Sequence, residues 1–133
     1  MKIAIAGAGE VGSHLAKLLS NENQDIILID ENADKLATLD ANYNIMTLTG
    51  CPTNFSTLRE AGVATADLFR AVTPYETDNV VACSMAKNLG ASTTVARIAS
   101  YDYMNPANRE LVRRMGVDRL IYPEYLAAIE IIT

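Results

Sequence analysis

Three glycines near the amino terminus have the spacing of a loop that binds phosphate. Gly7, Gly9 and Gly12 form a Gly-x-Gly-x-x-Gly pattern that follows the apolar run 3–6 and precedes apolar residues at helical spacing. In such a loop the first glycine permits a tight turn, the second lets the backbone approach a pyrophosphate, and the third lets the helix pack close to the strand. Backbone N–H groups at the helix N-terminus then face the phosphates. The predicted phosphate-binding residues are Gly7, Ala8, Gly9, Glu10, Val11 and Gly12.

An acidic residue follows at the distance expected for a ribose ligand. Asp30 ends the apolar run 26–29 and lies 18 residues after Gly12. A carboxylate in this position accepts hydrogen bonds from the hydroxyls of an adenosine ribose and repels a 2′-phosphate. Because Glu31 follows directly and no Arg is adjacent, the sequence favours NAD(H), or an adenine nucleotide such as ATP, over NADP(H). The alternative is a glycine-rich turn without a ligand, beside a solvated carboxylate.

Four further residues have both a ligand-binding and a structural interpretation. Arg97 is a charge inside the apolar run 94–98, which is costly unless the guanidinium meets a phosphate or a neighbouring carboxylate. Asn79 and Glu76 open the helix predicted after the fourth strand, close to the crevice where parallel sheets bind ligands, and they contact a ligand or cap the helix. Lys35 reaches the adenosine end of a ligand or stays solvated.

The cysteines and the single histidine argue against a metal site. Cys51 follows Gly50 at the end of the third predicted strand, at the rim of the expected adenine pocket. We interpret it as a small buried thiol, with a redox-sensitive thiol as the alternative. Cys83 is the second cysteine and His14 the only histidine, so the chain lacks the ligands of a structural zinc site. Two isolated cysteines suit a reducing cytoplasm.

The chain does not carry the groups that a dehydrogenase needs besides its cofactor. None of the six tyrosines begins a Tyr-x-x-x-Lys pattern, and His14 lies on the first predicted helix rather than in a substrate-binding half. The sequence therefore predicts a nucleotide-binding module that is not an enzyme. The alternative is the cofactor-binding domain of an NAD-dependent dehydrogenase separated from its catalytic domain.

These residues are positioned by strands and helices that alternate along the chain. The predicted strands are 3–6, 26–29, 45–48, 68–72, 94–98 and 120–122, and the predicted helices are 11–19, 36–43, 53–61, 74–89 and 105–116. The pattern Thr73-Pro74-Tyr75-Glu76 has the spacing of a capping box, and Asn105-Pro106 that of an N-cap followed by proline. Apolar strands separated by amphipathic helices indicate a parallel sheet. We expect one domain, 1–133, with a Rossmann-like doubly wound α/β fold and strand order 3-2-1-4-5-6.

Composition and charge exclude several classes of protein. Of the 133 residues, 50% are hydrophobic and 20% are charged, which argues against disorder. Eleven Lys and Arg against sixteen Asp and Glu give a net charge of −5, which argues against a dedicated nucleic-acid binder. No apolar run reaches the ~18 residues of a membrane span.

The end of the sequence predicts an interface. Leu126, Ile129 and Ile132 recur at helical spacing without a cap, and an apolar stripe of this kind is typical of a contact with a partner. We expect a homodimer built partly on this helix and on the late strands. We also expect the chain to be part of a longer protein with a C-terminal regulatory domain.

The order of these motifs resembles the N-terminal nucleotide-binding domain of Trk/Ktr-type potassium-uptake regulators, also called RCK or KTN domains. The similar segments are 5–12, 28–31, 58–63, 66–67, 76–79, 82–87, 96–98, 115–118 and 122–124, so the resemblance covers essentially the whole chain. The family usually has Asp after the glycine that follows the third strand, where this chain has Cys51.

The resemblance implies a ligand-gated regulator rather than a catalyst. It implies binding of NAD(H), ATP or ADP, assembly as dimers into rings, and attachment to a membrane-embedded potassium channel or transporter at the cytoplasmic face of the membrane. The family's pocket positions correspond to the loop 7–12 and to Asp30, Glu31, Gly50, Cys51, Thr73, Asn79 and Arg97.

Overall fold

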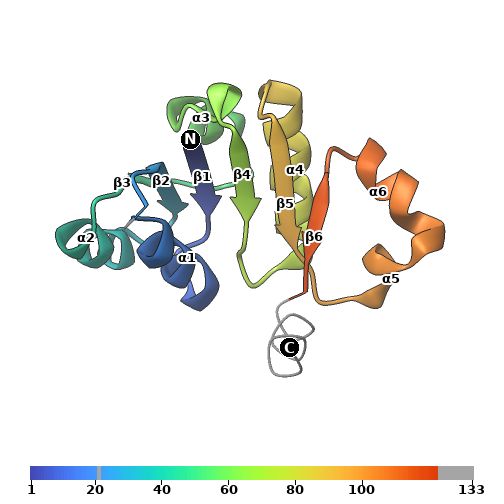
Figure 1. Ribbon diagram of the computed structural model, residues 1–133, viewed down its shortest axis with the longest axis horizontal. Helices are drawn as coiled ribbons and strands as arrows, with labels where there is room; N and C mark the ends of the chain where they lie inside the picture. The colour runs from blue at the N-terminus through green and yellow to red at the C-terminus, as the bar shows by residue number, and fades with distance from the viewer. Residues whose placement is uncertain (21, 123–133) are drawn as a thin grey trace.

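One parallel sheet organises the molecule. The computed structural model describes residues 1–20 and 22–122. Its six strands lie in the order β3-β2-β1-β4-β5-β6 (Figure 1). Every neighbouring pair is parallel, which confirms the predicted fold and strand order. The strands are β1 (Lys2–Ala6), β2 (Asp25–Asp30), β3 (Met46–Thr49), β4 (Leu68–Ala71), β5 (Thr93–Arg97) and β6 (Arg119–Ile121).

Helices join successive strands and cover both faces of the sheet. They are α1 (Glu10–Ser20), α2 (Ala33–Asn42), α3 (Phe55–Glu60), α4 (Glu76–Leu89), α5 (Tyr101–Met104) and α6 (Arg109–Arg114), with short 3-10 turns η1 (Val63–Thr65) and η2 (Pro106–Asn108). Local sequence explains their ends. The side chain of Asn32 accepts from the first amides of α2, and that of Asn54 from the Thr57 N–H of α3. Gly90, with a φ of 128°, ends α4 as predicted.

The core consists of two apolar clusters, one on each face of the sheet. Ile3 and Ile5 of β1 point to the face covered by α1 and α2, together with Leu36. Ala4 and Ala6 point to the opposite face, where α3, α4 and α6 pack. Because the central strands are buried on both faces, they read as continuous apolar runs rather than as alternating ones.

Three details of the predicted helices were wrong. The capping box is not formed: Tyr75 is the N-cap of α4, without a side-chain cap, and the Thr73 hydroxyl instead donates to Asn79 Oδ1 at 2.7 Å. The helix predicted over 105–116 is divided into η2 and α6, and α5 before it was not predicted. The predicted cap at Asn105 is confirmed, because its side chain accepts from the Ala107 N–H.

The predicted C-terminal helix 126–132 lies outside the described residues. Among the helices in the described part of the chain, none has both the length and the apolar character needed to cross a bilayer.

Candidate functional site

The loop between β1 and α1 needs its glycines for different reasons. Gly7 has a φ of 113°, and a Cβ there would lie 3.0 Å from the Thr73 nitrogen. A Cβ on Gly12 would overlap the carbonyl oxygen of Gly7, so α1 can start this close to β1 only with glycine. A Cβ on Gly9 would have no atom within 4 Å. The first and third glycines therefore serve the turn and the packing, and the space over the second is open.

Asp30 holds this loop in place. It is the last residue of β2, and its Oδ2 accepts from the Ala8 N–H at 2.7 Å. Its Oδ1 accepts from the Asn32 N–H at 2.8 Å, at the start of α2. An ionised carboxylate has about four acceptor positions. The side chain can therefore keep both contacts and still accept a further hydrogen bond, so its role as a ribose ligand stays a prediction.

A pocket of about 270 Å³ opens beside this carboxylate. Its lining residues come from the end of β2, from the loops after β2, β3 and β4, and from the first turns of α2 and α4; they are Asp30, Glu31, Lys35, Cys51, Pro52, Thr53, Thr73, Pro74, Tyr75 and Asp78. Five of them are predicted site residues that lie far apart in the sequence. Cys51 is half-buried, not fully buried as expected, and its Sγ lies 3.2 Å from Thr53 Oγ1. Tyr75 had no sequence signal that could have identified it.

Two further hollows adjoin this pocket. A smaller one, about 60 Å³, lies between β4 and β5 and is lined by Thr73, Pro74, Glu76, Asn79, Arg97, Ile98, Ala99 and Tyr122. A groove of about 400 Å³ runs from the glycine loop between α1 and α2, lined by Ala8, Gly9, Glu10, Ser13, Lys17, Lys35, Thr38 and Leu39. The first pocket shares Thr73 with the smaller hollow and Lys35 with the groove. The three hollows are therefore neighbours at the carboxyl ends of the strands, and together they are called the cleft.

Two other predicted site residues, Val11 and Gly50, support the lining of these hollows without being part of it. Val11 packs against the apolar cluster beneath α1 and α2. The Gly50 N–H donates to the Asp30 carbonyl at 2.9 Å, and a Cβ on Gly50 would lie 2.8 Å from Thr57 Cγ2. Gly50 therefore keeps the loop after β3 close to β2 and lines none of the three hollows.

Arg97 ends β5 and is half-buried beside the smaller hollow. The alternative interpretation of this residue, an ion pair with a neighbouring carboxylate, is not found within residues 1–20 and 22–122. There the ion pairs are Lys87–Asp118 and Arg114–Glu110. Among the described residues the Arg97 guanidinium therefore has no ion-pair partner.

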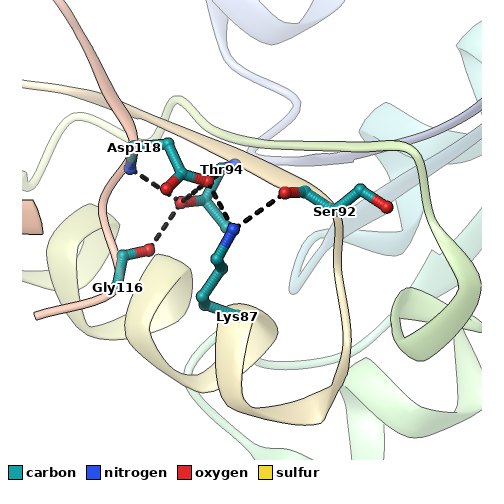
Figure 2. A network of polar contacts seen from close by, with 5 residues as sticks. All are labelled: Lys87, Ser92, Thr94, Gly116 and Asp118. Carbon is teal, nitrogen blue, oxygen red and sulfur yellow. Dashed lines mark hydrogen bonds and ion pairs between the residues drawn. The ribbon is translucent and has the colours of Figure 1, made fainter. Parts of the chain in front are cut away.

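A polar network at the opposite end of the strands, where β5 and β6 begin, holds the C-terminal end of α4 (Figure 2). Lys87 Nζ lies 2.8 Å from Asp118 Oδ2 and donates to the Ser92 carbonyl at 2.8 Å. Thr94 N–H donates to the same carboxylate at 2.9 Å. Burial tends to raise the pKa of Asp118, but the hydrogen bonds from Lys87 and Thr94 outweigh it and hold the pKa below its ordinary value. The network orients α4, whose first turns line the cleft.

The second thiol has no place in the cleft. Cys83 is fully buried on α4, and burial raises its pKa to about 12. Since the thiolate is the reactive form of cysteine, Cys83 is an inert core residue at neutral pH.

The chain is similar in sequence to known proteins over nearly its whole length. The family model described as the TrkA-N domain matches residues 3–123. The Trk system potassium uptake protein TrkA of Haemophilus influenzae is 39% identical over an alignment of 133 positions that covers 98% of this chain and 29% of that protein. The protein of that name from Vibrio alginolyticus is 42% identical over an alignment of 130 positions that covers 95% of this chain and 28% of that protein. The chain thus spans less than a third of the length of these relatives.

Solved structures show the same fold. The TrkA-N domain of the inner membrane protein ybaL from Escherichia coli superposes with a TM-score of 0.84 at 16% identity, over 98% of this chain and 93% of that chain. The GsuK channel bound to NAD gives a TM-score of 0.73 at 22% identity, over 90% of this chain and 21% of that chain. Since the family model matches nearly the whole chain, the chain belongs to the TrkA-N domain family, as the resemblance in its sequence indicated.

Proposed function

We propose that the cleft binds an adenine dinucleotide, NAD(H), with ATP and ADP as alternative ligands. One observation carries this proposal: the carboxylate of Asp30 is fixed to the Ala8 N–H, beside the open space over Gly9. A pyrophosphate placed over Gly9 brings the adenosine ribose within reach of that carboxylate. The solved GsuK channel bound to NAD has the same fold, which supports the assignment.

The hollows divide such a ligand into two parts. The pocket of about 270 Å³ that begins at Asp30 takes the adenosine, and the hollow between Thr73 and Arg97 takes the end beyond the pyrophosphate. Lys35, beside the groove and the adenosine pocket, and Arg97, beside the smaller hollow, supply positive charge to a ligand that is itself anionic. Asp30 and Glu31 disfavour a 2′-phosphate by like-charge repulsion, so the cleft favours NAD(H) over NADP(H).

We infer that the whole protein is a regulatory subunit of a potassium channel or transporter and not an enzyme. The names of its relatives, Trk system potassium uptake proteins, support this role. A ligand shifts a conformational equilibrium only by its differential affinity for the two states. NADH, NAD and ATP share the adenosine pocket and differ beyond the pyrophosphate, so they act through the hollow at Arg97.

This role places the protein in the cytoplasm, on the inner face of the membrane through its transporter partner. It also requires an assembly that can change shape, for which a homodimer that forms part of a larger ring is the simplest arrangement. Light scattering at micromolar concentration is expected to give a dimer, and a monomer would contradict this part of the proposal.

A thermal-shift titration with NADH, NAD, NADPH, ATP and ADP tests the binding proposal. A ligand that binds only the folded state adds ~2.7 kcal/mol to the free energy of unfolding at a hundredfold excess over Kd. We expect stabilisation by NADH, NAD, ATP and ADP and none by NADPH. If no nucleotide stabilises the chain, the cleft is not a nucleotide site.

A further inference from the structure

Asn79 lies between the ends of two strands and is almost completely enclosed. It occupies the first turn of α4, and only 1% of its surface is exposed. Its Oδ1 accepts from the Thr73 N–H at 2.9 Å and from the Thr73 hydroxyl at 2.7 Å. Its Nδ2 donates to the Thr73 carbonyl and to the Arg97 carbonyl, both at 2.9 Å. The side chain therefore joins the loop after β4 to the last residue of β5.

These contacts use the whole hydrogen-bonding capacity of the amide. An asparagine side chain has two N–H donors and an oxygen with two acceptor positions, and Asn79 fills all four. The partners also fix its orientation, because a backbone N–H must face the oxygen and two carbonyls must face the nitrogen. Nothing remains on this side chain for a ligand, although the residue lines the smaller hollow.

The backbone segments that Asn79 joins carry residues that line the cleft. Thr73 lines both the adenosine pocket and the smaller hollow, and Arg97 lines the hollow alone. The first residue of α4, Glu76, adds a second tie, because its Oε1 accepts from the Ser100 N–H at 3.3 Å. The start of α4 thus fixes the distance between the β4 loop and the end of β5.

We propose that Asn79 is a positioning residue that sets the shape of the hollow for the part of the ligand beyond the pyrophosphate. This inference rests on the proposed function of the cleft. It predicts a selective defect: loss of the asparagine amide weakens a ligand that fills the hollow and spares one that ends at the pyrophosphate. A residue needed only for folding would weaken both ligands alike.

The test compares NADH with ADP, which has the adenosine and the pyrophosphate but nothing beyond them. In Asn79→Asp, a carboxylate oxygen replaces Nδ2 and faces the carbonyls of Thr73 and Arg97, so the two strand ends are pushed apart. Calorimetric titration is expected to show that NADH binds about tenfold more weakly while ADP stays within about twofold, the size of effect expected when one hydrogen-bonded contact is lost. Asn79→Ser, which is neutral and leaves room for a bridging water, gives the same pattern to a smaller degree and replaces the first variant if that one does not fold.

Asn88→Asp is the matched control, because Asn88 is exposed on the same helix and donates only to the Ser84 carbonyl at 2.8 Å. It makes the same change of charge and is expected to leave both affinities unchanged. Equal weakening of NADH and ADP in the Asn79 variants, or no weakening of either, overturns the inference while the cleft remains a nucleotide site. Failure of the unmodified chain to bind NADH and ADP overturns the proposed function, and the inference with it.

Discussion

The carboxylate of Asp30 accepts a hydrogen bond from the Ala8 N–H at 2.7 Å, so the end of β2 holds the loop that follows β1. The same side chain also accepts from the Asn32 N–H, and Asn32 in turn caps α2. Hydrogen bonds that involve an ionised group are about twice as strong as neutral ones. One carboxylate thus orders the glycine loop and, in the proposed function, also binds the ribose.

Asp30→Asn removes the negative charge of this residue and keeps its shape almost unchanged. The amide can accept from only one of the two backbone N–H groups and turns its own donor toward the other. We expect the affinity for NADH to fall by about tenfold or more, and the free energy of unfolding to fall by about 1 kcal/mol. Calorimetric titration and urea denaturation measure the two effects. Asp40→Asn, on the exposed surface of α2, is the control and is expected to change neither. An unchanged affinity for NADH in Asp30→Asn would show that Asp30 is only a structural brace.

Two glycine variants separate binding from folding in the same loop. In Gly9→Ala the new methyl group meets no protein atom within 4 Å but enters the space proposed for the pyrophosphate. We expect an unchanged Tm and a loss of nucleotide affinity of at least about tenfold, about 1.4 kcal/mol. In Gly12→Ala the methyl group overlaps the Gly7 carbonyl, so the free energy of unfolding is expected to fall by about 3 kcal/mol, the upper range for overpacking. Thermal melts with and without NADH report both, and full binding by Gly9→Ala would count against a ligand over this glycine.

The sheet could be predicted because its central strands are apolar on both faces. The run 26–29, for example, lies within β2 and is short by only one residue at each end. The helix α5 was missed because it has four residues and depends on a local cap, the Ser100 hydroxyl accepting from the Asp102 N–H. Local contacts of this kind leave no periodic pattern in the sequence.

The site could be predicted in part. The glycine spacing and Asp30 could be identified because their roles follow from the local turn between a strand and a helix. The contacts of Asn79 could not, since its partners Thr73 and Arg97 are 6 and 18 residues away and meet only after β4 and β5 have paired. The packing role of Gly50 could not be predicted either, because its close neighbour Thr57 comes from the next helix.

The contact between Lys87 and Asp118 predicts a specific dependence of stability on pH (Figure 2). The pKa of Asp118 is lower in the folded state than in the unfolded chain. Its contribution is therefore fully present above the unfolded pKa, about 4, and is lost as the pH falls through the folded pKa. We expect Asp118→Asn to lower the free energy of unfolding by about 1 kcal/mol at pH 7, with a difference from the unmodified chain that shrinks below about pH 4 in urea denaturation.

The second ion pair of the described residues provides the matched control. Arg114 and Glu110 are 3.9 Å apart, with side chains 74% and 69% exposed. An exposed pair of this kind contributes little, because water and salt screen it. Glu110→Gln is expected to leave the free energy of unfolding unchanged both at pH 7 and below about pH 4. If Asp118→Asn behaves like Glu110→Gln, the network does not stabilise the end of α4.

The different environments of the two cysteines allow ligand binding in the cleft to be followed by chemical modification. Cys51 is half-buried in the lining of the pocket proposed for adenosine, whereas Cys83 is buried in the core with a pKa raised to about 12. Because reaction with iodoacetamide requires an accessible thiolate, we expect modification at Cys51 alone in the folded chain, followed by mass spectrometry. Saturating NADH or ADP is expected to slow it by at least about tenfold, since a cysteine covered by ligand reacts only in the free fraction, about 1% of the chain at a hundredfold excess over Kd. NADPH is expected to give no protection. Equal reaction with and without NADH, in a chain that thermal melts show to bind it, would place the adenosine outside this pocket.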